Sequence, residues 1–326
     1  MFDSHVLGGF SIDAVRYADG AYDVDRLGGN AFWATLGACL AGATPAVHAV
    51  VGADYPEQAL GDLASCGVDV RGIRRRDDLP STRVSFAYEP GGGRSHPADP
   101  ARLVDLPQAD RDRFLDNTDR SDLLLATLPA ADDLDRGGTP SAWHLGLLPA
   151  QRLRELVDVL VDTTSPAAHL QLDCPDRSEL RREGCTVLLD VLPRVDLFLP
   201  STSDAAIFLP GLGPDDLVAT FHDWGARAVV LKCGEQGAVV SDGAQRWHVP
   251  VYRDSREFDP TGAGDVFGGA CLAVLAGGGD LVAAAVAGAA AASFATAVRS
   301  PMDLAGIDPT DYETRRAQIA SGVEAA

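Results

Sequence analysis

The sequence predicts a three-layer α/β fold, in which helices cover both faces of a mostly parallel sheet. Short β-like runs alternate with helical patterns along most of the chain, which is typical of such a sheet. The 326 residues are enough for one large domain. Hydrophobic residues make up 46% and aromatic residues only 6%, which indicates a core of small aliphatic side chains. We therefore expect one domain over residues 1–326.

The candidate strands are short apolar runs bounded by turn residues or by helical patterns. In chain order they are HVLGGF, AVHAVV, DLLLATL, HLQLD, LFLP and AVVLKC. Apolar residues at helical spacing predict helices at 149–161, 203–209, 214–224, 264–276 and 280–298.

Two segments differ because polar and apolar residues alternate in them. They are AYDVDRL at residues 21–27 and TRVSFAYE at residues 82–89. Alternation indicates a strand with one solvated face, so these strands predict a small β lid over the main body, formed by segments near 13–30 and 80–104. An edge hairpin without a function is the alternative.

The charge of the chain excludes several partners. Its net charge is −20 and its pI is about 4.5, which opposes binding to nucleic acid or to an anionic membrane surface.

The first residues show no secretory pattern, and the Ala-rich run at 281–298 predicts a buried helix rather than a membrane span. The six cysteines form no CxxC pair, which favours reduced thiols. We expect a cytoplasmic protein.

The segment DPTGAGDVFGG at residues 259–269 carries most of the functional information. Gly262, Ala263 and Gly264 have almost no side chain, so their backbone amides can approach a ligand closely. A helix begins there, and its first N–H groups and its dipole favour an anion. The sequence therefore predicts an anion hole that needs no Lys or Arg.

Asp265 lies in the first turn of that helix, beside the predicted anion hole. A carboxylate next to a transferring phosphoryl group can orient a hydroxyl and accept its proton. We therefore predict that Asp265 is a catalytic base. A plain helix-capping aspartate is the alternative.

The segment DPTGAGD resembles the signature Asp-x-Thr-Gly-Ala-Gly-Asp of the ribokinase-like, or PfkB, carbohydrate kinases. The resemblance extends along nearly the whole chain, in order, through Gly8, Asp13, Gly28, Gly29, VGAD, PSTRVSF, DCPDR, PSTSDA and KCGEQGA. It implies an ATP-dependent kinase with Mg²⁺, and Asp265 as its base.

The resemblance also implies roles for individual residues at the acceptor site. Asp13 corresponds to a carboxylate that binds sugar hydroxyls, with a surface turn as the alternative. Asp259 belongs either to the substrate site or to a loop that binds a monovalent cation such as K⁺. Where the family has an asparagine, this chain has Trp33, which either stacks on a sugar or base or belongs to the core. Gly29 and Asn30 are the other expected substrate contacts, Asn30 as a replacement for the missing asparagine.

The nucleotide side of the site is implied by two turns. Lys232 is the only lysine of the chain and precedes Gly234 and Gly237, an arrangement that resembles the family's ATP-binding turn. Lys232 either meets an ATP phosphate or lies exposed at a strand end.

The family's Asn-x-x-Glu reads as Ser201 and Asp204 here. Ser201 is therefore expected at ATP and Asp204 at the metal through water. Asp173 and Arg177 form either a cleft pair, with Arg177 at a phosphate, or a structural ion pair. His144 is interpreted as a core histidine.

The sequence thus predicts a kinase that phosphorylates a hydroxyl of a small molecule, most simply a sugar or sugar derivative. A nucleoside kinase and a catalytically weak ligand-binding or regulatory protein on the same fold are the alternatives. The expected partners are the small-molecule substrate and a second copy of the chain that pairs through the lid.

Overall fold

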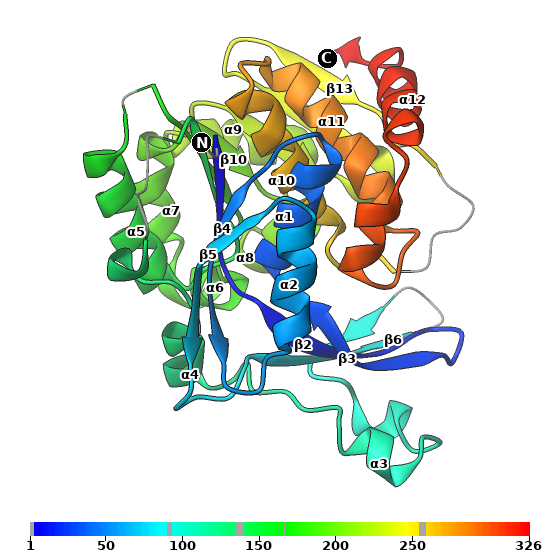
Figure 1. Ribbon diagram of the computed structural model, residues 1–326. Coiled ribbons are helices and arrows are strands. Elements are labelled where there is room, and N and C mark those ends of the chain that lie inside the picture. Colours follow the sequence, from blue (N-terminus) through cyan, green and yellow to red (C-terminus); the bar gives the residue numbers. More distant parts are fainter. Residues whose placement is uncertain (1–2, 90–92, 135–139, 166, 254–258) are drawn as a thin grey trace.

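The computed structural model describes residues 3–89, 93–134, 140–165, 167–253 and 259–326, and its main body is built on one large sheet (Figure 1). The strand order is β14-β13-β12-β11-β10-β9-β8-β1-β4-β5. Neighbours from β5 to β11 pair in parallel, whereas β11 to β14 pair antiparallel. The strands are β1 Ser4–Leu7, β4 Ala46–Gly52, β5 Asp69–Arg76, β8 Ala142–Leu145, β9 His169–Asp173, β10 Leu197–Leu199, β11 Val229–Lys232, β12 Ala238–Ser241, β13 Arg246–Val249 and β14 Glu324–Ala325.

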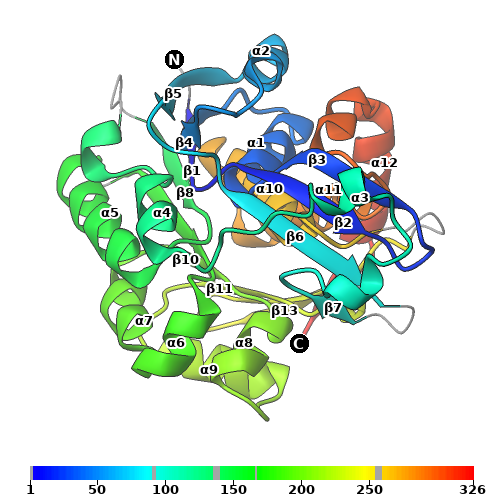
Figure 2. The same cartoon turned by 90° about the horizontal axis from the view of Figure 1, so that it is seen from below.

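Helices cover both faces of this sheet, as Figures 1 and 2 show from two directions. One layer contains α1 Asn30–Leu40, α2 Glu57–Ser65, α10 Ala263–Ala276, α11 Leu281–Ala295 and α12 Pro309–Ala320. The other contains α5 Ala150–Thr163, α6 Arg177–Glu183, α7 Thr186–Val191, α8 Thr202–Phe208 and α9 Pro214–Asp223. Two large apolar clusters of buried residues fill the spaces between the layers. The predicted three-layer α/β fold is confirmed.

A second, four-stranded sheet lies across one end of the main body (Figure 2). Its order is β3-β2-β6-β7, formed by β2 Ser11–Arg16, β3 Tyr22–Gly28, β6 Arg83–Tyr88 and β7 Arg94–Ser95. Both alternating segments of the sequence lie in this sheet. We call it the lid sheet; residues 90–92, within the expected lid segment 80–104, are outside the described part of the chain.

One strand prediction is wrong. The run DLLLATL forms the short helix α4, Ser121–Ala126, and the strand in this part of the chain is β8 instead. A short apolar run does not by itself distinguish a strand from a helix. Here Leu123 is buried while Leu124 and Leu125 are half-buried, and the Thr127 hydroxyl donates to the Leu123 carbonyl, which closes a helical turn.

The sequence patterns did not indicate α1, α2 or α12. Eight of the eleven residues of α1 are buried, so the helix has no polar face and no helical period in its polarity. The small helix α3, Gln108–Arg111, lies beside the lid sheet (Figure 2).

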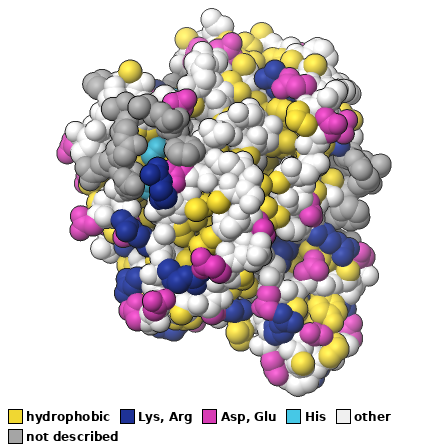
Figure 3. Space-filling model, viewed as in Figure 1, with side chains coloured by type: hydrophobic (Ala, Val, Ile, Leu, Met, Phe, Trp, Pro, Cys, Tyr) yellow, Lys and Arg dark blue, Asp and Glu magenta, His cyan; other side chains and the backbone are white. Residues whose placement is uncertain are grey.

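The surface mixes charges of both signs. On the face seen in Figure 3, Lys and Arg side chains alternate with Asp and Glu rather than gathering into one basic area. Within the described ranges, no helix has both the length and the apolar character that a membrane crossing requires.

Candidate active site

The N-terminus of α10 provides the predicted anion hole. Gly262 is the N-cap residue at φ 79°, and no side chain caps the helix. A Cβ atom at Gly262 would collide with the ring of Trp33, so only glycine fits this turn. The Ala263 amide donates to the Pro260 carbonyl at 3.2 Å, whereas the amides of Gly264 and Asp265 donate to no described residue. These two first-turn amides are the free donors for an anion.

Asp265 lies in the first turn of α10 and is half-buried. Its carboxylate has no hydrogen-bond partner among the described residues. Burial, followed by the charge of Asp173, raises its pKa to about 8, although Lys232 lowers it. A carboxyl group with a pKa close to neutrality is well suited to accept a proton during catalysis.

Lys232 and Asp173 meet at the carboxyl ends of two strands of the large sheet. Lys232 ends β11 and Asp173 ends β9. The ammonium donates to both carboxylate oxygens, at 2.9 and 3.1 Å, and both side chains are largely buried. A Cβ atom at Gly264 would lie 3.3 Å from Lys232 Nζ, so this cation borders the anion hole. Burial lowers the pKa of Lys232, but Asp173 outweighs burial and the pKa is raised.

Ser201 and Asp204 form a capping box at the start of α8. The Ser201 hydroxyl donates to Asp204 Oδ2 at 2.6 Å, and Arg177 Nη1 donates to Asp204 Oδ1 at 3.0 Å. Both oxygens of Asp204 are therefore partnered within the protein. Across the described residues there is no group of three or more His, Cys, Asp or Glu side chains that could hold a metal.

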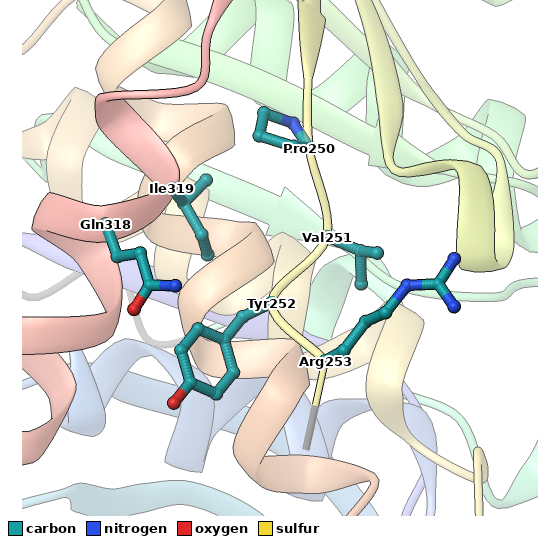
Figure 4. Close-up of a pocket in the computed structure, with 6 residues that line it drawn as sticks. All are labelled: Pro250, Val251, Tyr252, Arg253, Gln318 and Ile319. Carbon is teal, nitrogen blue, oxygen red and sulfur yellow. The ribbon is translucent and has the colours of Figure 1, made fainter. Parts of the chain in front are cut away.

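The turn with Gly234 and Gly237 lies beside a cavity. Gly237 has φ 85°, and a Cβ atom there would collide with the Val249 carbonyl. That Cβ atom would also lie 3.2 Å from Pro250 Cα, and Pro250 lines a cavity of about 380 Å³ (Figure 4). The residues that line it are Pro250, Val251, Tyr252, Arg253, Gln318 and Ile319.

The lid sheet brings Asp13 and Arg26 to the other side of the site. They are partners across β2 and β3, and both are buried. Arg26 Nη1 donates to Asp259 Oδ2 at 2.8 Å. Burial raises the pKa of Asp259, but the Arg26 charge and hydrogen bonds outweigh it and hold the pKa below its usual range. Burial raises the pKa of Asp13 to about 6, against the opposing charge of Arg26.

The remaining expected substrate residues contact the backbone or pack in the apolar core. Gly29 has φ 100° and lies against the Gly9 backbone. Asn30 accepts from the Gly9 amide and donates to the Leu147 carbonyl, both at 3.0 Å. Trp33 is only 2% exposed and belongs to the large apolar cluster. The Trp33 ring packs against Gly262 and supports this turn from the core side.

Two residues at the site were not anticipated from the sequence. Arg26 connects the lid to Asp259, and the Tyr88 hydroxyl forms a hydrogen bond with Thr261 Oγ1, one residue before Gly262. Arg26 carried one signal, a charge within an alternating strand that was expected to cover a site. Tyr88 lies in the other alternating segment, but nothing in the sequence indicated its partner, which is 173 positions away. His144 is fully buried beside Gln171, and burial lowers its pKa to about 3, as for a neutral core histidine.

The fold of the chain is ribokinase-like. Residues 163–305 match the model of the pfkB family carbohydrate kinases. This match covers somewhat less than half of the chain.

Other proteins resemble the chain over most of its length. A cytidine kinase of Thermococcus kodakarensis is 26% identical over 278 residues, which are 84% of this chain and 88% of that protein. The crystal structure of an E. coli protein described as a ribokinase II, with ATP and Mg²⁺, covers 98% of this chain and 100% of its own at a TM-score of 0.75 and 20% identity. A Burkholderia thailandensis nucleoside kinase with inosine covers 97% and 96% at a TM-score of 0.70 and 16% identity. At these identities the two structures show the shared fold.

Proposed function

We propose that the protein transfers the γ-phosphoryl group of ATP to a hydroxyl of a sugar or sugar derivative, with Asp265 as the catalytic base. The observation that carries the proposal is the position of Asp265. Its carboxylate, which has a raised pKa and no described partner, lies in the same first turn as two free backbone amides.

The chemistry follows from this arrangement. Asp265 accepts a hydrogen bond from the acceptor hydroxyl, aims its oxygen at the γ-phosphorus, and takes the proton as the new O–P bond forms. The amides of Gly264 and Asp265 and the nearby Lys232 ammonium stabilise the negative charge of the phosphoryl oxygens. ADP is the leaving group.

ATP fits the nucleotide side of the site. The start of α10 would hold its phosphates, and the turn with Gly234 and Gly237, next to the cavity, would hold its nucleoside part. When bound, Mg²⁺ neutralises charge on the phosphates. Because both oxygens of Asp204 are already partnered, this chain would hold the ion through its water shell. Ser201 would contact ATP only by releasing its capping bond to Asp204.

A nucleoside as acceptor is the second candidate. It is favoured by the likeness to the cytidine kinase, which extends over 84% of this chain. Both acceptor classes present hydroxyls on a sugar ring, so the same base serves either.

Four features remain predictions. The first is a requirement for K⁺. Both oxygens of Asp259 already accept hydrogen bonds, one from Arg26 and one from the Thr261 amide. The others are closure of the lid sheet over the acceptor, pairing of two copies through that sheet, and a cytoplasmic location.

The decisive test is Asp265→Asn, assayed by ADP release across sugars, sugar acids, phosphosugars and nucleosides. The amide keeps the shape but cannot take the proton, so turnover should fall by roughly 10²–10⁴-fold. ATP binding measured by calorimetry should persist. Turnover within about tenfold of the wild type would show that Asp265 is not the base.

A further inference from the structure

Gln171 connects the large sheet to the backbone of α10. Its Nε2 donates to the Gly268 carbonyl at 2.7 Å, about one helical turn after Asp265. The same nitrogen lies 2.8 Å from His144 Nδ1. Because a carbonyl can only accept, the end of the side chain that faces Gly268 must be its NH2 group. Both hydrogens of this group are therefore used, one by α10 and one by the neighbouring strand.

His144 holds the Gln171 amide in this orientation. The two residues are partners across β8 and β9, and both are fully buried. Because Nδ1 accepts, the neutral ring carries its proton on Nε2, and burial lowers the pKa of His144 to about 3. His144 also packs on α10 directly, since a Cβ atom at Gly268 would lie 2.7 Å from its Cε1.

This polar pair opposes its own burial. Gln171 Oε1 and His144 Nε2 are buried and have no hydrogen-bond partner among the described residues, and an unsatisfied buried polar atom is unfavourable. Apolar side chains would fill the same space without that cost. What the pair provides, and apolar packing does not, is a directed bond to one carbonyl of α10.

The packing of α10 explains why such a bond matters. Gly268 and Gly269 have no side chain, and a Cβ atom at Gly269 would lie 1.8 Å from the Ala34 carbonyl of α1. The helix is therefore in close contact with α1 and with the sheet at this turn. Helices are normally held along their axes by side chains that interlock. At these two glycines there is none, so the Gln171 bond fixes the helix here.

The same strand also supports the first turn of α10. Asp173 lies two residues after Gln171 on β9, so its side chain points to the same face of the sheet. Asp173 holds Lys232, whose Nζ would lie 3.3 Å from a Cβ atom at Gly264. Two strand residues span about 6.6 Å, and the four helical steps from Gly264 to Gly268 span about 6 Å. β9 therefore supports α10 at two points with matched spacing.

We propose that Gln171, oriented by His144, is a positioning residue that fixes α10 along its axis and so aligns its first turn with the Lys232–Asp173 pair. The proposal rests on the kinase function above. Gln171 acts through α10 and not by contact with a substrate. Its effect falls on kcat, because a base and an anion hole that are slightly displaced lose their alignment with the transferring phosphoryl group.

Three variants distinguish positioning from packing. Gln171→Met keeps the length of the side chain and removes its donor. The double variant Gln171→Met/His144→Leu also removes the ring that would be left without that donor. His48→Met is the matched control. His48 is buried in the same sheet and lies 2.9 Å from His5, but both rings pack on Trp143, which points to the opposite face from His144.

Three measurements are made on each variant. ADP release, with the acceptor that the wild type uses fastest, gives kcat and the KM for ATP and for the acceptor. Thermal unfolding gives Tm. Hydrogen exchange, read by mass spectrometry over residues 263–272 without substrate, reports the order of α10 independently of activity.

We expect Gln171→Met to lower kcat about 10–100-fold, to leave both KM values within about threefold of the wild type, and to speed exchange at residues 263–272. The double variant should have a higher Tm than Gln171→Met, because the unpaired ring is gone, but the same low kcat. A purely structural role would restore kcat together with Tm. His48→Met should leave kcat and the exchange of residues 263–272 unchanged.

Three results would overturn the proposal: a wild-type kcat in Gln171→Met, a kcat that recovers together with Tm in the double variant, or unchanged exchange at residues 263–272 in Gln171→Met. Absence of ADP release from the wild type with every acceptor would instead refute the kinase function. Faster exchange in Gln171→Met but not in His48→Met would then still support the positioning of α10 by Gln171.

Discussion

Lys232, the only lysine in the chain, donates hydrogen bonds to both carboxylate oxygens of Asp173, at 2.9 and 3.1 Å. The two residues end strands β11 and β9 and lie next to the start of α10. Charges of both signs therefore act on Asp265: Asp173 raises its pKa and Lys232 lowers it. The pKa of Asp265 therefore depends on an ion pair to which it does not itself belong.

The activity should depend on pH through Asp265. Its carboxyl must be ionised to act as a base, and its pKa is raised to about 8. We expect kcat/KM for the acceptor to rise with pH and to level off near pH 8. Below that pH it should fall by about tenfold per unit. A flat profile between pH 6 and pH 8 would exclude an essential base with this pKa.

The same pKa predicts a stability effect of opposite sign. Because the folded-state pKa lies above the unfolded value, folding binds a proton at Asp265 between about pH 4 and pH 8. The stability from this group is complete below pH 4 and is lost as the pH rises through 8. Asp265→Asn removes this loss, so its Tm should exceed that of the wild type by more at pH 9 than at pH 5. Thermal unfolding at the two pH values measures the difference.

Replacing the partner of Lys232 should shift the pH profile. Asp173 is the charge that most raises the pKa of Asp265, and Lys232 opposes it. In Asp173→Asn the negative charge that raises the pKa of Asp265 is lost, while the ammonium that lowers it remains, so this pKa should fall. The acid limb of kcat/KM should move to lower pH. A limb that stays in place, in a variant that still folds by circular dichroism, would mean that the two carboxylates are not coupled.

Chemical labelling can test whether Lys232 meets ATP. An amine-reactive acylating reagent has one lysine target in this chain besides the N-terminus. Acylation removes the charge next to the anion hole, so turnover should fall in step with modification of Lys232 measured by peptide mass. MgATP should slow both. The Lys232→Arg variant is the control, because it has no lysine to acylate. Equal modification with and without MgATP would place Lys232 outside the ATP contact.

The turn at Gly262 should tolerate no side chain. Gly262 and Gly278 have nearly the same φ, 79° and 80°, but a Cβ atom at Gly278 meets nothing within 4 Å. Gly278→Ala therefore carries only the cost of the left-handed backbone, roughly 1–2 kcal/mol. Gly262→Ala also collides with Trp33. It should lower Tm further and reduce kcat strongly, because the anion hole is displaced. Equal Tm values and an intact kcat for Gly262→Ala would show that the Trp33 contact is unimportant.

The local patterns of the sequence determined much of the fold and one part of the site. Alternating strand and helix patterns indicated the three-layer fold, because consecutive residues show the periodicity with which side chains are buried. Likewise, GAGD at residues 262–265 specifies a glycine turn, a helix start and a carboxylate within four positions, so it indicated an anion hole and a base without any distant contact. The run DLLLATL was predicted wrongly because a strand and a helix would both bury some of its leucines.

Only the tertiary structure decided which charges act on Asp265 and which residues the lid sheet brings next to the loop before α10. Lys232 and Asp173 are 59 positions apart, and Arg26 and Asp259 are 233 positions apart. Their pairing arises from the order of the strands and the placement of the lid sheet, which no local pattern encodes. Burial, which raises the pKa of Asp265 and lowers that of His144, is likewise a property of the packed molecule.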